Sequence, residues 1–220
     1  MSLQIFVADD HEVVRKGLCA LLENGTGWSV CGEAANGREA VEKVLALRPQ
    51  VVVMDLAMPQ LNGLEATRQI LKHAPRTAVL VLSATESEEM VREVLKAGAR
   101  GFVLKSDSGQ DLVVAVDGLR RGRPFFSARV ADFVVRGYLE GASGVEEPKS
   151  PASTGKALTA REREVLQLLA EGKTNKEVAA GLTIQVKTAE AHRANLMRKV
   201  GVRSLGELIR YAIRNGIVEP

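Results

Sequence analysis

The sequence predicts an α/β domain, a doubly wound parallel sheet, followed by a small all-helical domain. Short apolar runs alternate with amphipathic stretches through the first part of the chain, and residues from 158 onward have helical periodicity throughout. The length of 220 residues suits two domains, each large enough to bury a core. These observations predict two domains of different class.

Five apolar runs are expected to form strands, and helical periodicity follows each of them. The runs are Leu3–Ala8, Trp28–Ala34, Val51–Met54, Ala78–Leu82 and Gly101–Leu104. Such (βα)5 alternation is typical of a parallel sheet covered on both faces. In a flavodoxin-like sheet, with strand order 2-1-3-4-5, the ends of strands 1, 3, 4 and 5 meet in one crevice.

Helix starts are indicated by a capping residue with an acidic residue three positions later. The pairs are Asn36/Glu39, Thr85/Glu88, Ser108/Asp111, Thr159/Glu162, Thr174/Glu177 and Ser204/Glu207.

A linker is expected between the two domains. A helix near Ser127–Leu139 precedes the segment Glu140–Lys156, which is rich in Gly, Ser, Pro and charge. A flexible chain of roughly 17 residues has ends about 20–25 Å apart on average. We therefore expect the first domain over residues 1–122, a helix and linker over 123–157, and the second domain over 158–220.

Net charge and the two cysteines indicate what kind of partner and which compartment to expect. Residues 1–150 carry a net charge of −2 and residues 151–220 a net charge of +5, which favours a polyanionic partner for the second domain only. Cys19 and Cys31 lack metal-site spacing and are expected to be reduced core residues. The N-terminus has no targeting pattern and no run is long enough to span a bilayer, so a cytoplasmic protein without a membrane partner is expected.

Polar residues stand at the carboxyl ends of the predicted strands. Asp9 and Asp10 follow the first, Asp55 the third, Ser83 the fourth and Lys105 the fifth. Neighbouring carboxylates repel one another unless a hard cation lies between them, and Mg²⁺ prefers carboxylate oxygens, waters and phosphate. The three acids therefore imply a magnesium site.

This set of residues can accept a phosphoryl group. Asp55 is the candidate nucleophile, while Mg²⁺ and Lys105 neutralise the phosphoryl oxygens and Ser83 donates a hydrogen bond to one of them. Each residue alone has a structural explanation, such as a helix cap or a solvated charge. Their joint position at the ends of the right strands favours the functional interpretation.

The first part of the chain resembles the receiver domain of two-component response regulators, over about residues 3–122. The motifs are Asp9-Asp10, Asp55 with Met58-Pro59 and Asn62-Gly63, Ser83-Ala84, and Gly101–Lys105. The resemblance implies that Asp9, Asp10 and Asp55 hold Mg²⁺ with the main-chain carbonyl of Ala57. It also implies a switch that pairs Ser83 with an aromatic residue, here Phe102, for which a plain core role is equally compatible.

The second domain reads as four helices, Thr159–Glu171, Thr174–Ala180, Val186–Val200 and Ser204–Asn215, with Gly181–Gln185 as the turn of a helix-turn-helix. The motifs Leu158–Leu166, Asn175–Ala179 and Val186–Arg193 resemble the LuxR-type helix-turn-helix. Together with the receiver, they indicate a response regulator of the NarL/FixJ class.

The third of these helices is expected to read DNA. Ala189, His192, Leu196 and Val200 repeat at helical spacing and are expected to face the core. The side chains expected to face outward are Lys187, Glu190, Ala191, Ala194 and Arg198. We expect those nearest the helix N-terminus to meet base edges, and Lys176, Arg193 and Arg198 to lie against phosphates, although any one cation could be a solvated surface charge.

The resemblance implies a DNA-binding transcription regulator that a sensor histidine kinase phosphorylates on Asp55, with phosphorylation promoting a homodimer and promoter binding. Two alternatives remain open. An aspartate-nucleophile phosphohydrolase needs a second acid two residues after the nucleophile, where this chain has Ala57. A constitutive DNA-binding protein with a vestigial receiver is disfavoured by the complete set of pocket residues.

Overall fold

The computed structural model describes residues 2–24, 27–84, 87–107, 109–134 and 158–218. Internal contacts divide the chain into two compact units, Met1–Ser143 and Gly144–Pro220.

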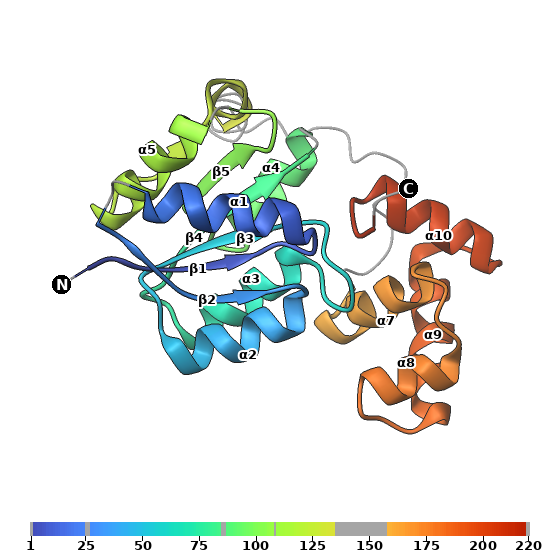
Figure 1. Cartoon of the computed structure of the whole chain (residues 1–220). Coiled ribbons are helices and arrows are strands. Elements are labelled where there is room, and N and C mark those ends of the chain that lie inside the picture. The colour runs from blue at the N-terminus through green and yellow to red at the C-terminus, as the bar shows by residue number, and fades with distance from the viewer. Residues whose placement is uncertain (1, 25–26, 85–86, 108, 135–157, 219–220) are drawn as a thin grey trace. The chain divides into compact units, whose positions relative to one another are not determined.

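The first unit is built on a parallel sheet of six strands in the order β2-β1-β3-β4-β5-β6 (Figure 1). The strands are β1 Gln4–Ala8, β2 Ser29–Ala34, β3 Val51–Asp55, β4 Ala78–Ser83, β5 Gly101–Leu104 and β6 Phe125–Phe126. Strands β3, β4 and β5 are buried along their whole length, as expected for apolar runs covered on both faces. Their carboxyl ends therefore form one edge of the sheet.

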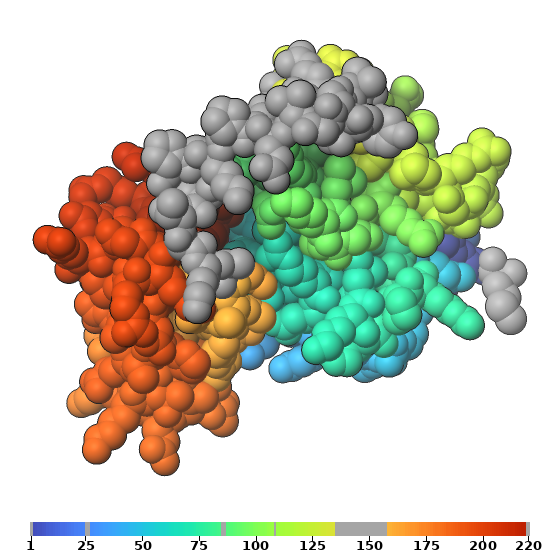
Figure 2. All heavy atoms as spheres, turned by 180° about the vertical axis from the view of Figure 1, so that it is seen from behind, coloured from blue at the N-terminus to red at the C-terminus, as the bar shows by residue number. Residues whose placement is uncertain are grey.

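Five helices cover the two faces of this sheet. They are α1 Glu12–Glu23, α2 Gly37–Leu47, α3 Gly63–His73, α4 Glu88–Lys96 and α5 Gly109–Arg120. One core packs residues of α2, α3 and α4 against Phe6, Met54 and Phe102, and the other packs α1 and α5 against Ile5 and Val53. The view from behind shows the teal and green surface that α3 and α4 present (Figure 2). Alternate strand residues thus enter opposite cores.

The second unit is all-helical: α7 Ala160–Ala170, α8 Asn175–Gly181, α9 Val186–Val200 and α10 Leu205–Arg214. Its core joins one apolar face of each helix, through residues such as Leu166, Val178, Leu196 and Leu208. Reciprocal capping boxes begin α7 and α8, with Thr159/Glu162 and Thr174/Glu177. The sequence pattern predicted these four helices to within one residue at each end.

The structure differs from the sequence expectation at two points. A sixth strand, β6, extends the sheet beyond the predicted five. The sequence did not predict it, because a two-residue strand is too short to show an alternating pattern. Helix α4 is capped by Ser87, whose side chain accepts a hydrogen bond from Met90 N; the predicted cap Thr85 lies outside the described residues, as does Ser108.

Other expectations fall partly outside the described part of the chain. Of the helix predicted near Ser127–Leu139, residues 128–134 are described and helical, and the predicted linker lies in the range that is not described. Cys19 and Cys31 are both free and partly buried. Within the described ranges, no helix is both long enough and apolar enough to cross a membrane.

Candidate functional site

The predicted pocket forms at the carboxyl end of the sheet. The ammonium nitrogen of Lys105 lies 2.9 Å from Asp9 Oδ2 and 2.9 Å from Asp55 Oδ2. The Asp9 and Asp55 side chains are 0% and 2% exposed, so one lysine bridges two buried carboxylates. The structure thereby brings together three residues that lie far apart in the sequence.

The loop after β3 packs tightly under Asp55. Helix α3 begins at Gly63, and Gly63 N donates to the Leu56 carbonyl at 2.9 Å. A Cβ atom at Gly63 would lie only 1.9 Å from the Asp55 carbonyl oxygen, so this position requires glycine. Asn62 caps α3 by accepting a hydrogen bond from Glu65 N at 2.9 Å. The Asn-Gly pair thus folds the loop back beside Asp55.

The ends of β4 and β5 position two more predicted residues. Ser83 closes β4, is 3% exposed, and lies opposite Leu104 in the strand pairing. Lys105 N donates to the Ser83 carbonyl at 2.8 Å, and Asp107 Oδ2 accepts a hydrogen bond from Leu104 N at 2.8 Å. These main-chain bonds fix the base of the Lys105 side chain beside the end of β4.

The pKa values of Asp55 and Lys105 are both raised in the pocket. Burial raises the pKa of Asp55 above its ordinary value, because the attraction of Lys105 does not compensate for lost hydration. Burial of Lys105 opposes its charge, but hydrogen bonding and attraction from Asp9 and Asp55 outweigh that effect and raise its pKa. The pocket therefore holds more negative charge than one lysine balances.

The donor set of the pocket fits a divalent cation. Asp9 Oδ2, Asp10 Oδ1 and Asp55 Oδ2 are buried atoms that lack a well-aligned hydrogen bond among the described residues. Donor atoms of Asp9, Asp10, His11 and Asp55 all lie within 4.8 Å of one another. Buried carboxylate oxygens that share only one lysine are suitable ligands for a hard cation such as Mg²⁺. Ala57 is partly buried in the loop that follows Asp55.

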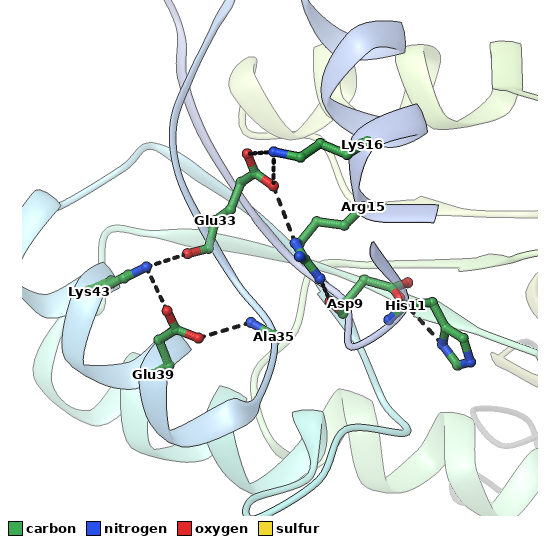
Figure 3. A network of polar contacts seen from close by, with 8 residues as sticks. All are labelled: Asp9, His11, Arg15, Lys16, Glu33, Ala35, Glu39 and Lys43. Carbon is green, nitrogen blue, oxygen red and sulfur yellow. Dashed lines mark hydrogen bonds and ion pairs between the residues drawn. The ribbon is translucent and has the colours of Figure 1, made fainter. Parts of the chain in front are cut away.

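Sequence reasoning missed two residues that touch this pocket, His11 and Arg15 (Figure 3). Arg15 Nη1 donates to the Asp9 carbonyl at 2.7 Å, while its Nε lies 3.2 Å from Glu33 Oε2. Lys16 contacts the same carboxylate at 3.0 Å. No sequence signal joined α1 to Glu33 on β2, because their contact depends on strand packing.

Phe102 is fully buried on β5 and belongs to the core shared with α2, α3 and α4. It pairs with Val81 on one side and Phe126 on the other. This packing accounts for an apolar aromatic residue here, and a switching role for Phe102 stays a prediction.

In the second unit, α9 presents the residues expected to face outward. Ala189 and Leu196 are buried and His192 and Val200 partly buried, as the helical spacing predicted. The exposed residues of α9 include Lys187, Glu190, Ala191, Ala194 and Arg198, and Lys176 is exposed on α8.

Two cations of α9, Arg193 in the middle of the helix and Arg198 in its last turn, have different partners. Arg193 is partly buried and donates to Asn175 Oδ1 at 3.4 Å, linking α9 to α8. Arg198 donates to Asn195 Oδ1 at 2.7 Å. Across residues 158–218, no ion pair joins Glu190 to Lys187 or Arg193. The carboxylate of Glu190 is therefore exposed, without an ion pair to any cation among residues 158–218.

Comparison with known proteins places both units. Residues 5–117 match the response regulator receiver domain, and residues 156–212 match the bacterial regulatory proteins of the luxR family. The oxygen regulatory protein NreC of Staphylococcus epidermidis is 37% identical over 218 residues, which cover 99% of this chain and all of NreC.

Two solved structures of a related regulator align with nearly the whole chain. RcsB of Salmonella typhimurium, studied for its conformational dynamism in DNA interaction, has a TM-score of 0.62 and 28% identity, covering 96% of each chain. RcsB dimers bound to two parallel DNAs give a TM-score of 0.57 and 27% identity, covering 96% of this chain and 98% of RcsB. The chain therefore belongs to the response regulators of the NarL type, DNA-binding transcription regulators that join a receiver domain to a LuxR-type helix-turn-helix.

Proposed function

We propose that Asp55 accepts a phosphoryl group from a sensor histidine kinase and that this modification controls DNA binding. The observation that supports this most strongly is the buried Asp55 carboxylate, which shares the Lys105 ammonium with Asp9. A receiver domain implies a kinase partner, and the relative RcsB is described as dimers bound to DNA. Because DNA and such kinases' catalytic parts lie inside the cell, we also propose a cytoplasmic protein.

The residues of the pocket divide the chemistry among them. A carboxylate oxygen of Asp55 attacks phosphorus, the bond from phosphorus to the donor nitrogen breaks, and an aspartyl phosphate remains. Lys105 and the Ser83 hydroxyl stabilise the charge on the transferred oxygens. Asp9, Asp10, Asp55 and the Ala57 carbonyl would hold Mg²⁺, whose charge neutralises both the acids and the incoming phosphoryl group.

Labelling with acetyl phosphate tests this assignment. The wild-type protein should incorporate phosphate in the presence of Mg²⁺ and lose it with a chelator. Asp55→Asn keeps the shape of the side chain and removes the nucleophile, so it should take no label. Asp117→Asn, at a partly exposed position on α5 outside the pocket, is the matched control and should label as wild type. Label retained in Asp55→Asn would contradict the proposal.

We propose that α9 enters the major groove of double-stranded DNA. The net charge of +5 in residues 151–220 and the exposure of its polar face support this role. Lys187, Glu190, Ala191 and Ala194 would lie toward base edges. The cations Lys176, Arg193 and Arg198 would contact phosphates.

We propose that Glu190 contacts a base in the DNA complex. An exposed carboxylate without a cationic partner is disfavoured in the field of DNA phosphates unless a base donates to it, and the cytosine N4 amino group can do so. Glu190→Ala should relax the preference at one base pair per half-site by roughly 1–3 kcal/mol. Lys176→Ala should weaken binding to all sequences alike and reduce the salt slope by about 1.

Selection of sites from a random DNA pool by each variant separates these effects. An unchanged base preference at every position in Glu190→Ala would exclude a reading role. A sequence-specific loss in Lys176→Ala would contradict a phosphate contact.

Phosphorylation should promote dimerisation, because one helix-turn-helix offers a small interface and two half-sites let a dimer add their contacts. Sedimentation of the full-length protein with and without acetyl phosphate measures this change in oligomeric state.

Hydrolase activity is not proposed for the pocket, because Ala57 stands where phosphohydrolases place a second acid, two residues after the nucleophile. Sustained phosphate release over many turnovers would favour a hydrolase, and absence of any labelling would favour a vestigial receiver.

A further inference from the structure

A nitrogen donor lies beside the carboxylates of the pocket. His11 follows the acid pair directly, and its Nδ1 lies 2.9 Å from Asp10 Oδ1 and 3.6 Å from Asp9 Oδ1. Its main-chain N–H also donates to Asp9 Oδ1 at 2.8 Å. In Figure 3 the imidazole points toward Asp9 from the start of α1. The ring therefore belongs to the same cluster of donor atoms as Asp55.

These separations match those of ligands around one metal ion. Ligands at about 2.1 Å from an octahedral ion are roughly 3.0 Å from their neighbours, and at tetrahedral angles roughly 3.4 Å. The two Nδ1 contacts, at 2.9 and 3.6 Å, are close to these two separations. Asp9 and Asp55 are almost fully buried, and Asp9 Oδ2 and Asp55 Oδ2 share the single ammonium of Lys105, while the buried Asp10 Oδ1 faces His11 Nδ1.

The His11 side chain has no evident role in helix formation. His11 is the N-cap residue of α1, but its side chain accepts no capping hydrogen bond. Helix N-caps favour Ser, Thr, Asp and Asn, whose short side chains accept from the first turn. The ring is 65% exposed, so it contributes little to the core, and its polar contacts are to the two aspartates.

We propose that His11 is a metal ligand, and that its imidazole increases the preference of the pocket for a first-row transition ion such as Co²⁺ over Mg²⁺. Imidazole binds the later first-row ions well, whereas Mg²⁺ prefers oxygen and gives up its waters reluctantly. The inference rests on the proposed phosphoacceptor pocket and adds to the preference for transition ions that the carboxylates already give.

Metal titration of the full-length protein tests the proposal without any phosphodonor. Co²⁺ and Mg²⁺ affinities are measured by calorimetry about one pH unit above the ordinary histidine pKa of roughly 6.5. Nitrogen coupling to bound Mn²⁺ is measured by pulsed EPR. His11→Gln removes the imidazole, and His73→Gln is the matched control, since His73 ends α3 with its Nδ1 3.0 Å from the Gln69 carbonyl.

The proposal predicts nitrogen coupling in the wild type and in His73→Gln, and its loss in His11→Gln. It also predicts a fall in Co²⁺ affinity on the order of tenfold in His11→Gln, with Mg²⁺ affinity unchanged. Absence of nitrogen coupling in the wild type, or equal loss of both affinities, would overturn it. Because no phosphate transfer is involved, failure of labelling at Asp55 and failure of metal selectivity remain distinguishable.

Discussion

Each unit of this protein buries a carboxylate against a lysine, and the two pairs behave in opposite ways. In the receiver, Lys105 Nζ lies 2.9 Å from Asp55 Oδ2, and the pKa of Asp55 is raised because burial dominates. In the helix-turn-helix unit, Lys199 Nζ lies 2.6 Å from Glu162 Oε2. Burial of Glu162 opposes its charge, but hydrogen bonds from Lys199 and Thr159 outweigh it and lower its pKa.

The difference lies in how many donors each carboxylate receives. Glu162 accepts hydrogen bonds from Lys199, from Thr159 N at 2.8 Å and from the Thr159 hydroxyl at 2.9 Å. Asp55 shares its lysine with Asp9, and its Oδ2 lacks a well-aligned hydrogen bond. A buried charge stabilises a fold only when its hydrogen bonds are satisfied. The Glu162 pair is therefore structural, whereas the Asp55 pair leaves negative charge for an incoming cation and phosphoryl group.

The largest effect is expected at the satisfied pair. Glu162→Ala removes half of a capping box and leaves Lys199 without its partner, so unfolding of the second unit should become easier by about 2 kcal/mol. Glu177→Ala is the matched control, because Glu177 forms the same capping box in an exposed position and has no lysine ion pair within residues 158–218. Its loss should be much smaller.

Urea unfolding of the full-length protein measures both variants. Trp28, the only tryptophan in the sequence, reports on the receiver, while far-UV circular dichroism reports on both units. Equal losses in the two variants would show that Lys199 adds nothing to the cap and would break the comparison.

Removing the charge of Asp55, in the pair with Lys105, should raise the stability of the receiver. With a chelator at neutral pH, Asp55→Asn removes a buried charge that the fold opposes, so the receiver should gain stability, on the order of 1 kcal/mol. Trp28 fluorescence in urea follows this transition. A less stable Asp55→Asn receiver would mean that Lys105 already satisfies Asp55.

The two pairs should also differ in their dependence on pH. The pKa of Asp55 is raised in the folded receiver, so the unfavourable contribution of its charge to stability in chelator is lost as pH falls through that pKa toward the ordinary 3.8. The stability gap between wild type and Asp55→Asn should therefore narrow on acidification.

The contribution of Glu162 has the opposite sign. With its pKa lowered, it stabilises the fold fully above the ordinary 4.5 and loses that effect as pH falls through the folded pKa. Comparison of wild type with Glu162→Gln over this range measures the loss. A gap that stays constant below pH 4.5 would contradict the assigned pKa shift.

Much of this architecture was predictable from sequence pattern. The apolar runs ending in Asp9, Asp55, Ser83 and Lys105 predicted both the strands and the crevice, because parallel strands bring their carboxyl ends to one edge. The capping pairs predicted where α7 and α8 begin. These sequence patterns are local, so they can be interpreted without knowledge of the tertiary packing.

The rest depended on contacts between distant segments. Nothing in the sequence placed Arg15 on the Asp9 carbonyl or the His11 ring beside Asp10, since both depend on the angle at which α1 leaves β1. Glu190 forms no ion pair with Lys187 or Arg193 in residues 158–218, although a helix brings residues three apart close together. Which of several nearby partners a side chain contacts depends on the folded structure and cannot be read from sequence spacing.

The central claim, that the pocket controls the DNA-binding unit through Asp55, is tested most directly by DNA affinity before and after phosphorylation. Fluorescence anisotropy with a selected promoter fragment, at fixed salt and with Mg²⁺, compares wild type and Asp55→Asn with and without acetyl phosphate. We expect acetyl phosphate to tighten DNA binding by the wild type and to leave the affinity of Asp55→Asn unchanged. Equal affinity of the labelled and unlabelled wild type, or equal tightening of Asp55→Asn, would contradict it.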